Sequence, residues 1–482
     1  MNERSLDRKP GRPPLGGVKG PLLFLLALCA CQHETAAVRD ATAPDETPAP
    51  DAAAVDRPVP RDGATVTPDT ALAPDGAVAP TPDAGPLADV APTEVVAPKT
   101  VVLDGARLAE NKRRLLAGDA QLTATLGLLR ASADAALTAG PWSVMNKTTT
   151  PPSGNKHDYL SLARYYWPSA SANGCPYVHK DGQTNPETSG NKYDHASRHA
   201  AVDAIYSLAM TWYFTGDARY AERAALVART WFLDPATAMN PNVNFGEGVP
   251  CLRDGTDTGV LNWTEMVGPL LDGLAVLDSG APGWTAADQM AMRTWLTAFL
   301  GWLQTSALGK EEGRAVNNHG TWYDAGVVTL MAYLGQTAQA KALIMGSGTK
   351  RLGSQIKADG TMPEELARTN SWGYSNWNLE GFCLMAHVGR PLGVDLWTYA
   401  APAGGSLVKA TAYLIDGAVK GKSAWPHPQI LPLEPAWAVT LFHAAAELGN
   451  DAGARAALAQ VKDPSDLWPL LPACTAPAIQ PN

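Results

Sequence analysis

Apolar side chains recur at helical spacing from about residue 100 onward, and this periodicity limits the possible fold more than any other feature of the chain. The stretch 202–231 shows the pattern twice, with intervals of three and four residues that place the apolar side chains on one stripe of a helix. The two stripes comprise Val202, Ile205, Ala209 and Trp212, then Tyr220, Ala224, Val227 and Trp231. A turn at 215–217 separates them, and Asp234-Pro235 ends the second. The pattern therefore predicts a pair of helices joined by a short turn.

Similar helical periods continue toward the C-terminus, while alternating strand patterns are scarce. Further helices are expected near 263–277, 285–305, 320–335, 376–388, 406–419 and 434–448. Helical pairs repeated over this length predict an all-α fold, an α/α solenoid or an α/α toroid rather than a simple bundle. The long segments 151–193 and 234–262 are rich in Trp, Tyr, Asn and Pro, and ordered loops of this length are usually functional.

The first 31 residues are similar to a bacterial lipoprotein signal peptide. Five basic residues precede the apolar run 21–28, which is too short to span a bilayer as a helix. The run ends in Leu28-Cys29-Ala30-Cys31, which resembles a lipobox with Cys31 as the lipidated residue; an ordinary secretory signal cut near Ala30 is the alternative. Both predict export. Gln32, in place of the aspartate of inner-membrane retention, favours the outer membrane, on its periplasmic or cell-surface side.

Residues 32–98 are predicted to form a disordered linker ahead of a folded domain at 99–482. The segment is dominated by Ala, Pro, Asp, Thr and Val, has no aromatic residue, and cannot bury enough apolar surface to fold. Residues 1–31 carry a net charge of +3 and residues 32–98 carry −9, which leaves −3 for the folded domain out of the total of −9. The domain lacks a basic stripe, which argues against nucleic acid as a partner.

Four cysteines remain in the predicted folded domain: Cys175, Cys251, Cys383 and Cys474. No two of them have the CxxC spacing typical of metal sites, and an exported protein can form disulfides. Four cysteines allow three pairings, and the sequence does not choose among them.

The first segment that combines rare polar residues with a helix start is 314–323. Within it, Asn317 or Asn318 is a candidate N-cap, and the following His319 lies in the first turn of a predicted helix. A helix N-terminus favours a bound anion, so this segment is a candidate anion site. The alternative is that the asparagines only cap the helix and His319 is a core residue.

The second segment of this kind is 359–376, which contains Arg368 and Tyr374. Six residues correspond to about 240° on a continuous helix, so the two side chains would not share a face. A helix break at 370–373 would bring them together, and a guanidinium beside a phenol is expected to lower the phenol's pKa. The alternative is a surface arginine and a buried tyrosine.

These residue types fit β-elimination in a uronate polymer better than any other reaction. The reaction needs neutralisation of the carboxylate at carbon 5, a base for the proton there, and an acid for the leaving oxygen at carbon 4. Asn and Arg can hydrogen-bond the carboxylate, His or Tyr can take the proton, and Tyr can return one. This chemistry requires neither a bound metal nor a cofactor.

Four stretches resemble the alginate lyase family of polysaccharide lyases, whose fold is an α/α toroid. They are 156–168 (KHDYLSLARYYWP), 213–241, the triplet Asn317-Asn318-His319, and 364–376. Their order is that of the family, and together they span roughly 155–390. The resemblance implies that Asn318 and Arg368 neutralise the carboxylate, and that Tyr374 is the catalytic acid and also the base of a syn elimination. It further implies that His319 assists this neutralisation, or that His319 is the base for the epimer whose carbon-5 proton lies on the opposite face of the sugar ring.

The interval between Arg368 and Tyr374 departs from the alginate-specific members of this family. Those members have one more residue in the interval and a histidine after the tyrosine, whereas Ser375 follows here. The shorter form is similar to relatives that cut other uronans, including glucuronan.

Further residues are predicted to bind the anionic polysaccharide. Candidates for lining the sugar subsites, together with Asn317, are Tyr159, Tyr166, Trp167 and Trp322. Lys156 and Arg198 are candidates for contacts with neighbouring carboxylates, and His427 for closing the groove. Aromatic side chains stack on sugar rings, although core packing is the commoner role of any single tryptophan.

Two other functions remain open from the sequence. A glycoside hydrolase on a similar toroid needs two opposed carboxylic acids. Its candidates are Asp181, Asp324, Glu364 and Glu365. A surface lipoprotein that binds polyuronate without turnover would use the same groove, and only the joint presence of His319 and Tyr374 argues for catalysis.

Overall fold

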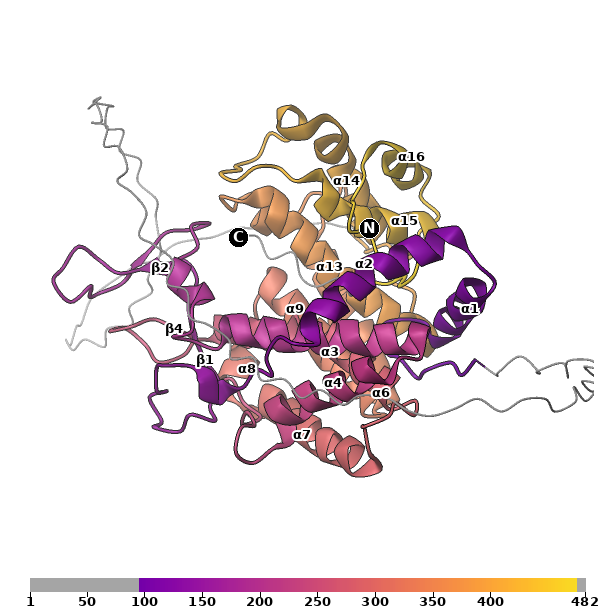
Figure 1. Cartoon of the computed structure of the whole chain (residues 1–482). Helices are drawn as coiled ribbons and strands as arrows, with labels where there is room; N and C mark the ends of the chain where they lie inside the picture. Colours follow the sequence, from indigo (N-terminus) through magenta and orange to yellow (C-terminus); the bar gives the residue numbers. More distant parts are fainter. Residues whose placement is uncertain (1–94, 475–482) are drawn as a thin grey trace, which may run out of the picture. The chain divides into compact units, whose positions relative to one another are not determined.

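The computed structural model describes residues 95–474, and helices dominate this part of the chain (Figure 1). The predicted leader with Cys31, and the predicted linker up to residue 94, lie outside the described residues. No helix within 95–474 is long and apolar enough to cross a membrane.

The body of the structure is a series of helical hairpins, each with an inner and an outer helix. The inner helices are buried on several sides: α3 His195–Thr215, α6 Val267–Leu277, α9 Asn318–Tyr333, α13 Ser371–Gly389 and α15 Val439–Glu447. The outer helices follow them in sequence: α4 Ala218–Ala228, α7 Ala286–Thr305, α10 Thr337–Leu343, α14 Leu407–Lys420 and α16 Ala452–Gln460. Consecutive inner helices contact one another, from α3 to α6, α6 to α9, α9 to α13 and α13 to α15. The predicted α/α toroid is confirmed.

Shorter helices complete the body. Two helices precede the hairpins, α1 Gly105–Leu116 and α2 Ala120–Ala136, and α2 packs against α3. The remaining short α-helices are α5 Leu261–Thr264, α8 Ala307–Glu312, α11 Thr349–Gln355 and α12 Pro363–Leu366. Single 3₁₀ or π turns are η1 Val144–Asn146, η2 Pro186–Ser189, η3 Arg229–Leu233, η4 Asp257–Val260, η5 Ile344–Gly348, η6 Arg390–Leu392, η7 Gly421–Ala424 and η8 Pro435–Ala438.

The helix expected over 263–277 is instead divided into α5 and α6. The division falls at Glu265 and Met266, shortly before Pro269 in the first turn of α6. A proline ring clashes with the carbonyl four residues earlier, here that of Glu265, and provides no N–H for it. A regular helix can therefore start just before Pro269 but cannot run through from Leu261.

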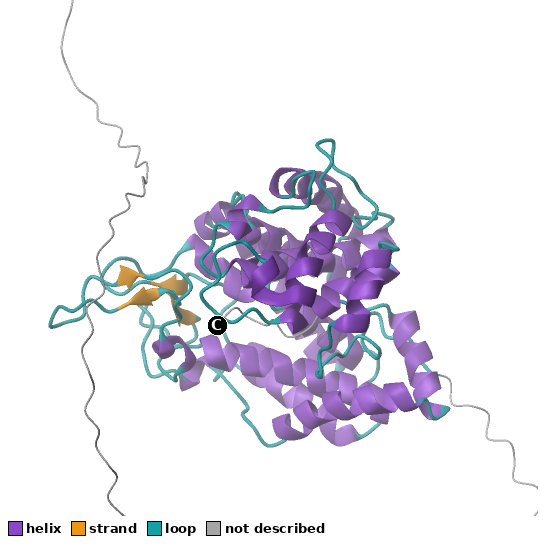
Figure 2. Cartoon of the chain, turned by 90° about the horizontal axis from the view of Figure 1, so that it is seen from above, coloured by secondary structure: helices purple, strands orange, loops and turns teal. Residues whose placement is uncertain are grey.

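Four short strands lie at one edge of the helical body (Figure 2). β1 Leu160–Leu162 pairs in parallel with β4 Phe245–Gly248, and β2 Tyr166–Trp167 pairs antiparallel with β3 Val178–His179. The first pair joins the two long segments that the sequence marks as functional loops. Within the second of these segments, the backbone of Gly259 lies so close to β4 that a side chain on Gly259 would collide with the carbonyl of Gly246.

Aromatic residues from α4 to α7 form a large part of the core. Trp263 contacts Trp231, Phe232, Trp295 and Phe299 through tilted or edge-to-face ring packing. Burial of each such side chain stabilises the fold by roughly 1.5–3 kcal/mol. Ten of the fifteen tryptophans are buried, so core packing rather than a sugar groove explains most of them.

The structure selects one of the three possible cysteine pairings. Cys175 is bonded to Cys251, which links the two long loops a second time. Cys383 of α13 is bonded to Cys474 near the end of the described chain.

Candidate active site

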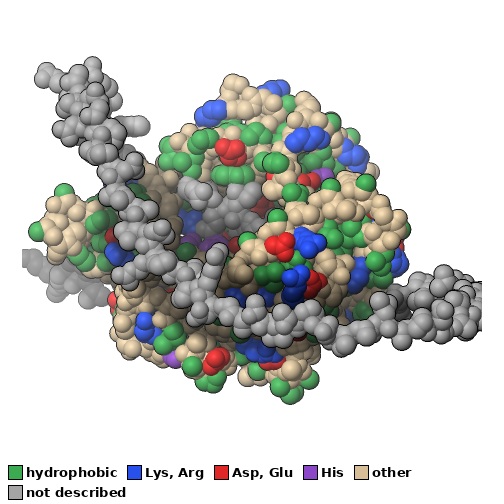
Figure 3. Space-filling view, in the orientation of Figure 1, with side chains coloured by type: hydrophobic (Ala, Val, Ile, Leu, Met, Phe, Trp, Pro, Cys, Tyr) green, Lys and Arg blue, Asp and Glu red, His purple; other side chains and the backbone are tan. Residues whose placement is uncertain are grey.

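Both sequence segments with rare polar residues end at one cavity beside the strands. The cavity has a volume of about 190 Å³, and its wall includes His319, Arg368 and Tyr374. The long loops contribute most of the rest of the wall, with Arg164, Tyr165, Tyr166, His179, Glu247, Arg253 and Asn262 among the lining residues, and Glu265 and Trp377 also line the cavity. Figure 3 shows a hollow in this face of the molecule, with charged and histidine side chains inside it.

Arg368 and Tyr374 meet because the helix is interrupted between them. α12 ends at Leu366 and α13 begins at Ser371, so the helix is interrupted over 367–370, a few residues earlier than the break expected at 370–373. The Arg368 guanidinium lies over the Tyr374 ring, 3.7 Å from its centroid. Asp181 holds the guanidinium from the other side with an ion pair of 2.5 Å and also accepts the hydroxyl hydrogen of Thr369. The arginine is thus fixed between a carboxylate and an aromatic ring.

Tyr374 is protonated in this environment. Burial raises its pKa well above the ordinary value, and the Tyr165 hydroxyl, 2.6 Å from the Tyr374 hydroxyl, raises it further. Arg368 opposes the shift but does not reverse it. The expectation that the guanidinium would lower the phenol's pKa is therefore wrong in its net result, because desolvation disfavours the phenolate more strongly.

His319 occupies the first turn of α9 and carries a buried acid as its partner. Asn317 is the N-cap, and its side-chain oxygen accepts the backbone N–H of His319 at 3.2 Å. Burial would lower the pKa of His319, but Glu312, whose Oε1 lies 2.9 Å from Nδ1, raises it to about 9. Burial also raises the pKa of Glu312, against the pull of His319. The imidazole is therefore a cation at neutral pH, which favours an anion in the cavity.

Asn318 lies behind the cavity rather than in its wall. The residue is fully buried, and its backbone N–H and its Nδ2 donate to Glu365 at 2.8 and 2.7 Å. Its Oδ1 has no hydrogen-bond partner within 95–474. Burial raises the pKa of Glu365 to about 7, although the two bonds from Asn318 act in the opposite direction. Asn318 is not among the residues that line the cavity, and its contact with a substrate carboxylate stays a prediction.

Gly320 follows His319 at a position where the structure leaves no room for a side chain. A side chain there would overlap the Ala315 carbonyl and the Arg351 guanidinium, which is anchored on Asp324. The loop before α9 therefore packs directly against the helix backbone.

The predicted binding residues divide into three groups. Tyr166 lines the cavity, with the Arg253 guanidinium 5.7 Å from its ring centroid. Trp167 follows it on β2, partly exposed, with Lys180 over its ring. Tyr159, Arg198 and Trp322 were expected to contact substrate but are buried: Tyr159 bonds Asn262, Arg198 pairs with Glu265, and Trp322 packs on Trp377. These positions need the side chains for packing and charge balance inside the body.

The last predicted binding residues lie outside the cavity wall. The Lys156 ammonium donates to the Met145 carbonyl, and Asn317 has the capping role described above. His427 shares a hydrogen bond of 2.7 Å with the Tyr413 hydroxyl. None of the three is part of the cavity lining.

Several lining residues were missed by the sequence reading. Arg164 and Tyr165 belong to the stretch 156–168 that carries the family resemblance. The sequence indicated this stretch, but Tyr159, Tyr166 and Trp167 were chosen from it as the binding candidates. Glu247 has a left-handed backbone with φ of 48°, uncommon for a residue with a side chain, and its Oε1 accepts from Asn262. Glu312 does not line the cavity but pairs with His319, and no local pattern marks this acid because it lies seven positions earlier, in α8.

The four carboxylates considered for a hydrolase do not form an opposed pair. Asp181 is bound to Arg368, Asp324 is bound to Arg351, Glu365 caps α9, and Glu364 is exposed. None of these four lines the cavity.

Comparisons with known proteins identify the family of the chain. The family model for alginate lyase matches residues 143–425. A crystal structure of an alginate lyase from Bacteroides ovatus is 32% identical, covering 78% of this chain and 99% of that chain with a TM-score of 0.73. Alginate lyase A1-III from Sphingomonas species A1 is 16% identical, covering 74% of this chain and 94% of that chain with a TM-score of 0.46. No curated protein matches the chain. The chain therefore belongs to the alginate lyase family and is a polysaccharide lyase.

Proposed function

We propose that the chain cleaves a uronic-acid polymer by β-elimination in the cavity of His319, Arg368 and Tyr374. The observation that carries the proposal is the presence of two cations and the Tyr374 side chain in the wall of one cavity. The cations neutralise the carboxylate at carbon 5, which acidifies the proton there and stabilises the enolate-like charge that develops. The phenol lies beside them, where the leaving oxygen needs a proton.

His319 acts as an electrostatic residue rather than as the base in this proposal. A histidine with a pKa of about 9 holds its proton at neutral pH and cannot take another. The paired Glu312 keeps this charge in a buried position, where an ion interacts strongly with an incoming carboxylate. Arg368 contributes the second charge, and Arg253 at the cavity edge is available for a neighbouring uronate.

Tyr374 is proposed as both base and acid. Its phenolate takes the proton at carbon 5 and then returns it to the oxygen at carbon 4, so the cycle ends with the residue in its starting state. Because its pKa is raised, only a small fraction is phenolate at neutral pH. We therefore expect kcat/KM to rise with pH and to level off above about 9, where His319 loses its proton.

The test is the absorbance of the unsaturated uronate product in the ultraviolet. The purified chain is incubated with alginate blocks, glucuronan and pectate, and glucuronan is included because of the six-residue interval from Arg368 to Tyr374. A rising signal on one polymer supports elimination and identifies the substrate. New reducing ends without absorbance would mean hydrolysis, and binding without either signal would mean a capture protein; both would refute the proposal.

We also propose that the chain is exported and anchored to the outer membrane through lipidated Cys31. The support is the lipobox-like Leu28-Cys29-Ala30-Cys31 after a basic leader and short apolar run. The chain should partition with membranes until detergent is added, and Cys31→Ser should release it. Cys29→Ser is the matched control and should remain membrane-bound. Membrane association that survives Cys31→Ser would contradict the anchor.

A further inference from the structure

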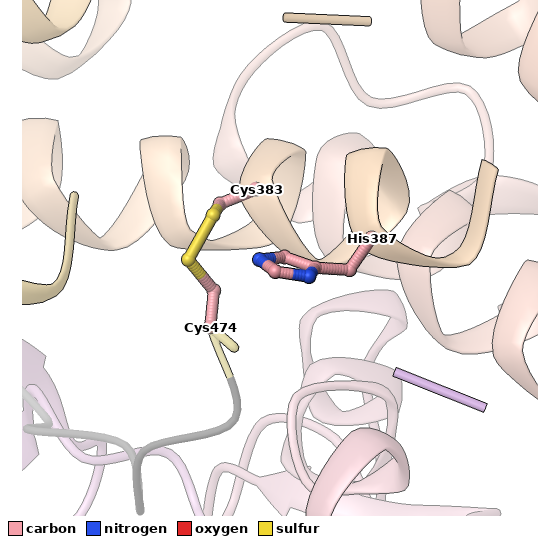
Figure 4. Close-up of side chains that lie close together, drawn as sticks. All are labelled: Cys383, His387 and Cys474. Atoms are coloured by element: carbon pink, nitrogen blue, oxygen red, sulfur yellow. A yellow bond between two sulfur atoms is a disulfide. The ribbon is translucent and has the colours of Figure 1, made fainter. Parts of the chain in front are cut away.

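A cluster of two cysteines and a histidine lies away from the candidate active site. Cys383 and His387 are four residues apart on α13 and so share one face of the helix. Cys474 reaches the same point from the C-terminal segment, 91 residues after Cys383 (Figure 4). Each of the three side chains can offer one ligand atom to a metal ion, and these atoms all lie within 4.8 Å of one another.

His387 has the state that a metal ligand needs. Its Nε2 is buried and has no hydrogen-bond partner within the described chain. His443 offers a contrast, because its Nε2 is 2.9 Å from Asp466 and is already satisfied. Both histidines contact the ring of Trp468.

The spacing of the cluster suits a tetrahedral cation. Two thiolates on a zinc ion lie about 3.8 Å apart, given zinc–sulfur bonds of about 2.3 Å. The Cα atoms of Cys383 and Cys474 are 5.8 Å apart, so the sulfurs can reach that separation by side-chain rotation. Two thiolates and one imidazole form a ligand set that zinc accepts, with the fourth position left for water.

We propose that Cys383, His387 and Cys474 bind one zinc-like thiophilic cation when their disulfide is reduced. A dithiol reductant supplies two electrons and two protons to the sulfur–sulfur bond, becomes a disulfide itself, and leaves two protein thiols. The cation then displaces both thiol protons to solvent, while His387 adds its lone pair without exchanging a proton. Disulfide and metal are thus alternative links between the same two parts of the chain.

The metal would keep the C-terminal segment attached to α13 after reduction. That segment is already docked elsewhere, since Asn111 donates to the carbonyls of Pro469 and Leu470 and Trp468 donates to Glu447. These contacts hold Cys474 near α13 without the disulfide. The thiols of the reduced chain therefore remain close enough to share one ion.

The experiment is a cobalt titration of the full chain after reduction and removal of the reductant without air. One equivalent of Co²⁺ should produce thiolate-to-cobalt charge-transfer absorption, and Zn²⁺ should displace it. His387→Ala should weaken binding at least about tenfold. His443→Ala is the matched control, because it removes the other histidine beside Trp468 and should leave binding unchanged.

Two further variants separate this cluster from the other disulfide. Cys175→Ser with Cys251→Ser should keep the absorption, whereas Cys383→Ser with Cys474→Ser should lose it, as should the oxidised protein. The proposal is overturned if the reduced chain shows no such absorption. It is also overturned if His387→Ala binds cobalt as tightly as the original chain. The two thiols would then bind the ion without the imidazole, and this conclusion holds whether or not the variant is folded.

Discussion

The starts of helices α9 and α13 provide the residues of the candidate active site by different physical means. At the start of α9, buried acids hold the polar groups: Glu365 accepts from Asn318, and Glu312 pairs with His319. At the start of α13, neutral groups from a distant loop do so. The Pro428 carbonyl accepts from Ser371, and the Gln429 side chain accepts from Trp372.

This difference explains why one helix start carries a charge and the other a neutral acid. A buried carboxylate beside His319 stabilises its proton, whereas no carboxylate contacts the Tyr374 hydroxyl among the described residues, and its hydroxyl partner is Tyr165. Activity should therefore depend on charge at the α9 start and on the phenol itself at the α13 start. Substitutions that change one property at a time separate these two dependences.

The largest effect is expected from Tyr374→Phe at the α13 start. Loss of the hydroxyl removes both proposed proton transfers, so kcat should fall about 10³-fold, within the usual range for general acid–base groups. The polymer should still bind, because His319 and Arg368 remain. Product absorbance and calorimetric binding measure the two quantities.

A tyrosine of α9 provides the control for this change. Tyr323, one of the two tyrosines of α9, donates to the Leu303 carbonyl and does not line the cavity, so Tyr323→Phe should leave turnover near that of the original chain. Undiminished turnover in Tyr374→Phe would remove this residue from the mechanism and would leave α9 as the source of the chemistry.

The titration of Glu365, which accepts hydrogen bonds from Asn318 at the α9 start, is expected to change the free energy of unfolding by about 3 kcal/mol. Its pKa rises from 4.5 to about 7 on folding, so the folded chain binds more protons than the unfolded chain between these values. The free energy of unfolding should therefore fall as pH rises from about 4.5 to 7. Glu365→Gln removes the titration, and Asn318 can present its unpaired Oδ1 to the new amide by rotating its own amide group.

Denaturant unfolding across this pH range measures the difference. The stability of Glu365→Gln relative to the original chain should increase with pH by up to about 3 kcal/mol. Glu364→Gln is the adjacent control on α12, and its exposed side chain should give no such trend. A constant difference between Glu365→Gln and the original chain would mean that Glu365 titrates normally.

The sequence predicted the two helix starts but not what surrounds them. Helical periodicity located α9 and α13 within a few residues, and the break between Arg368 and Tyr374 followed from local helix geometry. Glu365 was noted only as a candidate hydrolase acid, because its bond to Asn318 connects residues 47 positions apart. The raised pKa of Tyr374 was also missed, since burial depends on packing from several segments.

The same limit applies to the edge of the cavity. β1 and β4 have three and four residues and pair across the intervening α3 and α4, so neither carries a strand pattern long enough to recognise. Tyr159 lies in a long loop and Arg198 in the first turn of α3, and only their burial shows that they support the site from inside.

A moderate effect on the pH profile is expected from Glu312→Gln. Without the buried Glu312 anion, desolvation lowers the pKa of His319 against only the smaller opposing effects of Glu247 and Glu365, so the pKa falls from about 9. The levelling-off of kcat/KM should then move to lower pH, and the plateau should drop about tenfold for each unit of pKa lost. Rates from about pH 6 to 10 measure both changes.

Glu311→Gln is the control, because this neighbouring acid is exposed and pairs with Arg314 at the surface. Its profile should coincide with that of the original chain. An unchanged profile in Glu312→Gln would mean that the charge of His319 does not limit the reaction, and the α9 start would then differ from the α13 start in structure alone.

The smallest effect is expected from Asn317→Ala, which tests whether the α9 start positions His319 through its cap. Loss of an N-cap bond costs about 1 kcal/mol of stability. Ser406→Ala is a matched loss, because Ser406 caps α14 by accepting from Lys409, away from the cavity. Both variants should lose similar stability in denaturant unfolding. Only Asn317→Ala frees the first turn that holds His319, so it alone should reduce kcat/KM, by a few-fold. Equal activity in the two variants would show that Glu312 and Glu365 are sufficient to fix the α9 start, and that its cap serves the helix rather than the site.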